Sequence, residues 1–322
     1  MRTGAAQAVV DLGGDPVARL LDRVERRMSE LAVAYGPLLA RHAGETIAAG
    51  GKRLRPLLVC LAAGVPPPET EGLVRAAVAV ELVHGATLVH DDVLDGSPLR
   101  RGRPSVFAAG GRGVATATGD LLFSRAFGEL ADTGSVEAVR VLSRAARELA
   151  QGELLQRADA FDSSVSVERY LERCRLKTAV LFRAACELGA LESGEPAAEL
   201  GAFGERIGLA FQLFDDVLDV TGPPERTGKP RGADLLDGTV TLPLILARES
   251  DPELGALDLG QIVSSADAAR ICDRIAATAA LQRTTARALE LVSRAKQALP
   301  EVPAAQRRAL ELVADGVVER YS

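Results

Sequence analysis

The chain has 322 residues and a formal net charge of −6 at pH 7, with a pI near 5.4. A negative balance of this kind argues against binding to nucleic acid, which depends on clustered Lys and Arg. Hydrophobic residues make up 47% of the chain and charged residues 25%, ordinary values for a folded protein with a sizeable core. Aromatic residues are scarce at 3%, whereas the helix-favouring Ala, Leu, Glu and Arg recur, so the composition favours an all-α fold.

The chain contains four cysteines, Cys60, Cys174, Cys186 and Cys272. They are widely spaced and form no C-x-x-C pair, which predicts reduced thiols in a cytoplasmic protein. The N-terminus has no signal-peptide pattern, because Asp11 and Asp15 interrupt its mildly apolar opening. No stretch approaches the roughly 18 to 20 apolar residues of a membrane span, so we expect a soluble protein without a transmembrane segment.

The first predicted helix starts at Asp15-Pro16, since Asp is a favoured N-cap and Pro is favoured at the first helical position. Apolar residues then recur at helical spacing and mark one buried face. The members of this face are Val17, Leu20, Leu21, Val24, Met28 and Leu31. Residues 1–14 precede this start and are expected to be disordered.

A triple proline at 66–68 predicts a loop, and the segment from about Glu69 to Asp95 predicts one long helix. Residues 97–113 are rich in Gly, Pro and Arg and predict a second loop. Further helices are predicted over 114–132, 135–160, 166–190 and 196–221. The segment 221–238 is interrupted by Pro and Gly and predicts a flexible connection. Helical patterns resume from Thr241 to the C-terminus.

No long linker or shift in composition divides the chain. One all-α domain over residues 1–322 is therefore the simplest expectation.

The most informative feature is the segment Asp-Asp-Val-Leu-Asp, which occurs at Asp91–Asp95 and again at Asp215–Asp219. Residues four apart are neighbours on a helix, so the outer carboxylates of each copy face the same way and repel each other. Carboxylates concentrated among Val, Leu and Phe predict bound divalent cations rather than a solvated acidic face. All-oxygen ligation with several waters is the preference of Mg²⁺, which usually accompanies phosphate. We expect the two copies to face each other from two helices.

Two other metal sites fit the residues less well. An EF-hand loop starting at Asp91 would place Val93 at position three and Gly102 at position twelve, where a bidentate Glu belongs. A di-iron bundle needs Glu-x-x-His on two helices, and Glu81 with His84 supplies only one such pair.

Basic residues gather in four places. They are Lys52 with Arg53 and Arg55; Arg100 with Arg101 and Arg103; Lys177; and Lys229 with Arg231. Arg binds phosphate oxygens in a bidentate manner and Lys acts as a point charge. Together with the two acidic clusters, these residues predict a site for diphosphate groups.

The motifs occur in a characteristic order between about residue 50 and residue 245. They are Gly50–Pro56, Glu81–His84, Asp91–Asp95, Arg100-Arg101-Gly102, Gly119–Leu122, Lys177-Thr178, Phe211-Gln212, Asp215–Asp219, Gly228-Lys229 and Thr241-Leu242-Pro243. In this set and order the chain resembles the trans-isoprenyl diphosphate synthases, and the ending Val317–Arg320 also fits.

The resemblance implies a single-domain helical bundle with a deep central cavity below the two aspartate motifs, in a homodimer. The implied reaction joins isopentenyl diphosphate to an allylic diphosphate. Mg²⁺ assists ionisation of the allylic carbon–oxygen bond, the double bond of isopentenyl diphosphate attacks the cation, and a proton is lost to the departing diphosphate. An apolar product implies peripheral contact with a membrane for its release.

The resemblance also implies roles for single residues. The groups that would bind isopentenyl diphosphate are Lys52, Arg55, His84 and Arg101. Those that would hold the allylic diphosphate are Arg100, Lys177, Gln212 and Lys229. The implied catalytic set, which neutralises the leaving group or steadies the cation, is Lys177, Thr178, Gln212 and Lys229. The implied metal ligands are Asp91, Asp95 and Asp215, with Asp92, Asp216 and Asp219 orienting them or acting through water.

One position departs from the family pattern. Many members have Lys where this chain has Thr239, just before Val240. The change removes one expected diphosphate contact and leaves more of that role to Lys229.

Product length is expected to depend on the helix that carries the first aspartate motif. Ala86 and Thr87 lie one turn before Asp91, where short-chain members typically carry a bulky aromatic residue. Val83 and Ala79 continue a stripe of small side chains, and each open turn of about 5.4 Å admits roughly one more isoprene unit. A product longer than geranylgeranyl diphosphate is therefore expected, with Phe123 or Phe127 as a candidate floor.

Three alternatives stay open beside a long-chain synthase. A geranylgeranyl or farnesyl diphosphate synthase would share every motif. A terpene cyclase would need more aromatic residues than eight Phe and three Tyr, and no second diphosphate site. A non-catalytic partner subunit typically lacks one aspartate motif, whereas both are complete here.

Overall fold

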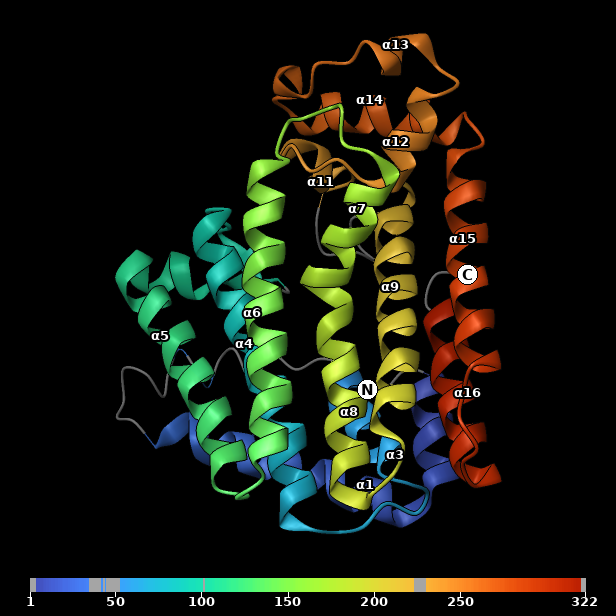
Figure 1. The fold of residues 1–322 in the computed structure, drawn as a ribbon. Coiled ribbons are helices and arrows are strands. Elements are labelled where there is room, and N and C mark those ends of the chain that lie inside the picture. The colour runs from blue at the N-terminus through green and yellow to red at the C-terminus, as the bar shows by residue number, and fades with distance from the viewer. Residues whose placement is uncertain are drawn as a thin grey trace. The chain divides into compact units, whose positions relative to one another are not determined.

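The computed structural model describes residues 4–34, 42, 44, 53–100, 102–222 and 230–319, with the backbone alone over 4–13. These residues are helical except for turns, loops and one short hairpin (Figure 1). In the hairpin, β1 (Leu99–Arg100) pairs antiparallel with β2 (Arg103–Pro104). The all-α fold predicted from the sequence is confirmed.

The chain forms two compact units, each assembled from stretches far apart in the sequence. Unit 1 contains Met1–Ala146, Leu181–Gly204 and Ala298–Gly316. Unit 2 contains Arg147–Val180, Glu205–Gln297 and Val317–Ser322. Because the units interleave along the chain, no single linker separates them in the sequence.

Unit 1 is built around one buried helix. Its elements are α1 (Gly4–Val33), α3 (Leu54–Ala62), α4 (Glu71–Leu94), the hairpin, α5 (Val106–Ala131), and parts of α6 (Val136–Ala158), α8 (Val180–Ser193), α9 (Ala197–Thr221) and α16 (Ala304–Glu319). Helix α4 packs along α5 and also contacts α1 and α3 (Figure 1). Its side chains are apolar on nearly every side, as expected of a helix that is covered all round.

Helix α1 matches the sequence prediction over most of its length. The backbone leaves helical geometry at Gly14, with φ of 65°, and the helix resumes at Asp15-Pro16 as predicted. All six predicted apolar residues from Val17 to Leu31 are buried. The backbone is already helical from Gly4, where disorder was expected, because the Ala-rich opening also favours helix.

Helix α4 begins and ends close to its predicted limits. Thr70 is the N-cap and its side chain accepts a hydrogen bond from the Leu73 N–H, and Asp95 is the C-cap. Among the described residues, α4 alone is long and apolar enough to cross a membrane, so the prediction that no stretch approaches this length was wrong. Because 67% of its apolar window is buried inside the structure, the core position explains that apolar character.

The predicted loop over 97–113 is shorter in the structure. Helix α5 starts at Val106 because Ser105 caps it, accepting a hydrogen bond from the Ala108 N–H. The glycines that favoured a loop produce instead a kink at Gly111, where φ is 75°.

Unit 2 combines parts of α6, α8, α9 and α16 with shorter helices. These are α7 (Val167–Cys174), the π-helical turn η1 (Arg175–Ala179), α11 (Ala233–Leu236), α12 (Leu242–Arg248), α13 (Pro252–Gly255), the 3-10 turn η2 (Leu259–Gln261), α14 (Ser265–Ala276) and α15 (Ala280–Gln297). Helices α12, α13 and α14 pack together, and α12 also contacts α15 (Figure 1). The predicted helix over 166–190 is therefore three consecutive pieces, α7, η1 and α8.

A buried carboxylate ties three arginines together in unit 1. Glu129 on α5 has a side chain with 0% exposure. It pairs with Arg27 at 2.9 Å, with Arg75 at 3.4 Å and with Arg125 at 3.6 Å. Helices α1, α4 and α5 are thus joined at one ion cluster that no motif in the sequence announces.

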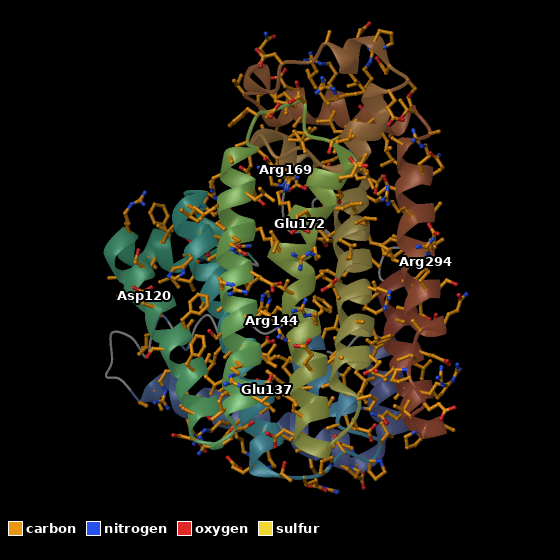
Figure 2. The ribbon with its side chains drawn as sticks, viewed as in Figure 1. Asp120, Glu137, Arg144, Arg169, Glu172 and Arg294 are labelled. Carbon is orange, nitrogen blue, oxygen red and sulfur yellow. The ribbon has the colours of Figure 1, made fainter. Side chains whose placement is uncertain are left out.

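Replacing Glu129 by Ala is expected to lower the free energy of unfolding by about 3–5 kcal/mol, because it leaves several guanidinium groups around an empty buried position. Urea denaturation followed by circular dichroism measures this change. Glu137→Ala is the matched control, since Glu137 on α6 (labelled in Figure 2) is exposed and pairs only loosely with Arg140. Its expected effect stays within about 0.5 kcal/mol. Equal effects of the two changes would contradict the role assigned to the cluster.

Candidate active site

The first aspartate motif lies at the C-terminal end of α4. The Asp95 N–H donates to the Asp91 carbonyl at 2.8 Å, so the two residues stand one turn apart as predicted. Asp95 is exposed and Asp91 is half-buried. Two adjacent, accessible carboxylates are an oxygen donor set that suits a hard divalent cation, so this pair fits the implied metal.

The second aspartate of the motif has a different environment. Asp92 is only 2% exposed, and one of its oxygens, Oδ1, accepts two hydrogen bonds from Arg100 on β1, from Nε at 2.9 Å and from Nη2 at 2.5 Å. Asp92 therefore fixes the Arg100 guanidinium close to Asp91 and Asp95, and its predicted role toward metal ligands stays a prediction. Arg100, the predicted diphosphate ligand, lies next to the motif.

The residue before the motif is packed against α5. The His90 ring stacks on Phe123 with centroids 5.8 Å apart, and its Nε2 lies 3.3 Å from Asp120 Oδ1. A Cβ on Gly119 would lie 2.2 Å from His90 Nε2, so a larger residue there would require the stacked His90 ring to move. The Gly119–Leu122 motif thus accommodates the turn of α4 that carries the aspartates (Asp120 is labelled in Figure 2).

Of the residues predicted to bind isopentenyl diphosphate, the structure describes Arg55 and His84. Arg55 on α3 lies over the Phe182 ring, with Cζ 4.7 Å from its centroid, and His84 lies on the adjacent helix α4. Lys52, Arg101 and Lys229 lie outside the described residues.

The sequence places Arg53 among the cations expected to bind phosphate, whereas in the structure its side chain forms ion pairs with two glutamates. Its backbone has a φ of 48°, and its guanidinium pairs with Glu25 at 2.5 Å and with Glu81 at 2.7 Å. Arg53 therefore joins α3 to α1 and α4. Its partner on α4, Glu81, lies three residues before His84. A basic residue next to Lys52 and Arg55 looks equivalent in sequence, and only tertiary structure separates the roles.

The second aspartate motif lies near the C-terminal end of α9. Its second residue, Asp216, is 2% exposed and accepts one hydrogen bond on each oxygen. Tyr170 Oη donates to Oδ2 at 2.5 Å, and Gln212 Nε2 donates to Oδ1 at 2.8 Å. Burial, together with the nearby Asp234, raises the pKa of Asp216 above its ordinary value. Like Asp92, Asp216 is therefore hydrogen-bonded to neighbouring side chains and is not accessible to a cation from solvent.

The two other predicted catalytic residues of this region are joined to that carboxylate. Thr178 Oγ1 donates to Gln212 Oε1 at 2.7 Å, and the same amide donates to Asp216. The chain of hydrogen bonds from Thr178 to Tyr170 therefore fixes how the Gln212 amide is turned. Sequence reasoning selected Thr178 and Gln212 and missed Tyr170, which no motif had marked.

Asp219 secures the segment that follows the motif. Its carbonyl accepts from the Gly232 N–H at 3.0 Å and its carboxylate from the Asp234 N–H at 3.4 Å. Arg231, another predicted phosphate-binding cation, pairs instead with Asp273 at 2.6 Å. These contacts hold the described residues just after Lys229 against α9 and α14.

The predicted metal ligands are divided between the units. Asp91 and Asp95 belong to unit 1, and Asp215 belongs to unit 2. Across the parts of the chain that the structure describes, three or more His, Cys, Asp or Glu side chains do not gather at metal-binding distance. The three-residue ligand set therefore stays a prediction.

Lys177 and Thr178 lie in the π-helical turn η1, where the Val180 N–H donates to the Arg175 carbonyl. Such turns are rare and often occur at functional sites. Helix α6 approaches this turn closely at Gly152, where a Cβ would stand 2.7 Å from Lys177 N and 2.9 Å from the Leu176 carbonyl carbon. The glycine is therefore what lets α6 pack directly on the turn.

A family model of the polyprenyl synthetases matches residues 37–274. The chain belongs to the polyprenyl synthetase family. The sequence-based assignment to the trans-isoprenyl diphosphate synthases, and to an enzyme of that class, is confirmed.

The chain is 38% identical over 308 residues to "Heptaprenyl diphosphate synthase component 2" of Geobacillus stearothermophilus, covering 94% of this chain and 95% of the relative. Among solved structures, a polyprenyl synthase from Caulobacter crescentus CB15 complexed with calcium and isoprenyl diphosphate is 37% identical, with a TM-score of 0.90 and full coverage of both chains. A decaprenyl diphosphate synthase from Rhodobacter capsulatus is 33% identical, with a TM-score of 0.87, covering 99% of this chain and 98% of the other.

Replacing Gly152 by Ala is expected to destabilise the protein by about 1–3 kcal/mol, because the new methyl meets backbone atoms of η1 that cannot move aside. Gly128→Ala on α5 is the control, since a Cβ there meets nothing within 4 Å. The control is expected to be neutral or to stabilise by up to about 1 kcal/mol, because Ala favours helix. Urea denaturation compares the two, and an unaffected Gly152→Ala protein would rule out the close approach.

Proposed function

We propose that this protein is a prenyltransferase that adds isopentenyl units to an allylic diphosphate and releases a long trans-polyprenyl diphosphate, with Mg²⁺ as its metal. The observation that carries the proposal is the common construction of the two aspartate motifs. In each, the carboxylate of the second aspartate is buried and hydrogen-bonded, while the first aspartate stays partly accessible one turn from the last. Both motifs occur in a chain of the polyprenyl synthetase family.

The chain's own residues would divide the reaction between them. Arg100 and Lys177 would bind oxygens of the leaving diphosphate, with Lys229 assisting. Bound Mg²⁺ would neutralise negative charge that develops on the same group. Thr178 and Gln212, whose orientations are fixed by Asp216, would face the allylic cation with their oxygen atoms. The second substrate would be held by the basic residues around α3 together with His84.

Support for a long product comes from relatives and from α4. The compared proteins include one named for heptaprenyl and one for decaprenyl diphosphate. Ala79, Val83 and Ala86 on α4 are small and buried, and Thr87 donates to the His84 carbonyl at 2.8 Å. A geranylgeranyl product is the second candidate, because "Geranylgeranyl diphosphate synthase" of Methanosarcina mazei is 39% identical over 259 residues.

We also propose that the active form is a homodimer in the cytoplasm. The name "component 2" of the Geobacillus relative points to a second possibility, a partner subunit of another kind. Light scattering on the purified chain, combined with an activity assay of the chain alone, separates a self-sufficient dimer from a component that needs a partner.

The function is tested by incubating the purified chain with Mg²⁺, isopentenyl diphosphate and farnesyl diphosphate, and sizing the products. We expect polyprenyl diphosphates of more than four isoprene units, lost on chelation and restored by Mg²⁺. Asp91→Asn and Asp215→Asn should each lower kcat by about 100-fold or more, whereas Asp22→Asn, at an exposed position on α1, should not. Cyclic hydrocarbons as products would establish a terpene cyclase instead.

Replacing Ala86 by Phe is expected to shorten the product, because the ring would occupy the space one turn below Asp91. Ala79→Phe, seven residues further along the same stripe, should stop elongation about two units later, since two helical turns rise about 11 Å. Chromatography of dephosphorylated products measures both lengths. Thermal unfolding of both variants controls for overpacking, since both alanines are buried. Identical product distributions in wild type and both variants would refute gating by α4.

A further inference from the structure

Helix α6 supplies a carboxylate to the π-helical turn that carries Lys177. Glu153 Oε2 lies 2.5 Å from Lys177 Nζ, and Glu153 Oε1 accepts a hydrogen bond from Arg157 Nε at 2.8 Å. The two side chains of the ion pair are 18% and 23% exposed, so the pair is largely shielded from water. Although burial raises the pKa of Glu153, Lys177 and Arg157 outweigh it and hold that pKa below its ordinary value.

The position of Glu153 follows from its neighbour. Gly152 brings the α6 backbone against Lys177 N and the Leu176 carbonyl carbon, and the next residue therefore emerges within reach of the Lys177 ammonium. The turn at η1 is wider than an α-helical turn, and α6 packs directly against it. A glycine followed by a carboxylate thus matches the shape and the charge of this turn at once.

A flexible lysine side chain gains most from such a partner. Its four-carbon stem has many rotamers, and fixing them before the substrate arrives removes that entropy cost from binding. An ammonium has three N–H donors, so an ion pair with one carboxylate oxygen is compatible with a diphosphate on the same nitrogen. The arrangement parallels Arg100, which Asp92 holds in the same manner.

We propose, building on the prenyltransferase function above, that Glu153 is a positioning residue that holds the Lys177 ammonium in the orientation in which it binds the allylic diphosphate. Glu153 itself touches no substrate in this scheme. It acts only through Lys177, so its removal should weaken one substrate site and leave the isopentenyl diphosphate site unchanged.

The chain contains a matched control for this role. Glu148, on the same helix α6, pairs with Arg175 on the same turn η1 at 3.2 Å, and its side chain is 12% exposed. Glu148→Gln and Glu153→Gln therefore each remove a carboxylate of α6 that pairs with a cation on η1, although Arg175 also pairs with Glu172 at 2.8 Å. Only Glu153 is joined to a predicted diphosphate ligand.

The experiment measures binding and kinetics on the full-length proteins. Calorimetry with inorganic diphosphate and Mg²⁺ gives a Kd that does not depend on turnover. Glu153→Gln should raise this Kd, and the KM for farnesyl diphosphate, by between about 10- and 100-fold, with less than a twofold change in the KM for isopentenyl diphosphate. Glu153→Asp should recover part of the loss, because it keeps the charge and shortens the reach. Glu148→Gln should leave all three constants near wild type.

A double substitution tests whether the effect passes through the lysine. If Glu153 acts through Lys177, Glu153→Gln combined with Lys177→Met should bind diphosphate no more weakly than Lys177→Met alone. Additive losses, or equal effects of Glu153→Gln and Glu148→Gln, would overturn the proposal. Loss of diphosphate binding on Glu153→Gln in a chain whose wild type makes no prenyl product would support the pairing and reject the prenyltransferase function.

Discussion

A carboxylate that is removed from water must be hydrogen-bonded or paired with a charge, and this requirement shapes both aspartate motifs. Asp92 and Asp216 occupy the second position of their motifs and are nearly sealed from solvent. Arg100 satisfies the first, and Tyr170 with Gln212 satisfies the second. Because these carboxylates fix the last turns of α4 and α9, the flanking aspartates are presented in a defined direction. The proposed metal site thus depends on two buried carboxylates that are hydrogen-bonded to protein side chains.

Much of the helical framework could be predicted from periodicity and caps. The apolar face of α1 and the limits of α4 follow from spacing that any buried amphipathic or core helix must obey. The start of α5 was missed because glycines near residue 110 outweighed the Ser105 cap, and the chain absorbed them as a kink. The turn η1 has no sequence signature, since its residues are as helical in pattern as those of α7 and α8.

The residues of the candidate site can also be separated into those that the sequence predicts and those that it does not. The residues proposed to touch substrate or metal belong to motifs that occur in a fixed order along the chain, and for this reason the resemblance could mark Asp91, Lys177 and Gln212 as candidates. The residues that position them cannot be predicted in this way. Tyr170, Glu153 and Gly152 have their roles only because of neighbours on other helices. Arg53 is the opposite case. Its position between Lys52 and Arg55 predicts a phosphate ligand, but its ion pairs with Glu25 and Glu81 connect helices instead.

The interleaving of the two units also has a consequence for synthesis of the chain. In unit 1, the Gln306 side chain donates to the carbonyls of Leu61 and Ala62, which lie 245 and 244 positions earlier in the sequence. These contacts cannot form until nearly the whole polypeptide has left the ribosome. Domains generally fold as units during translation, so this part of unit 1 is completed late, and a chain that stops before Gln306 would leave the end of α3 without these hydrogen bonds.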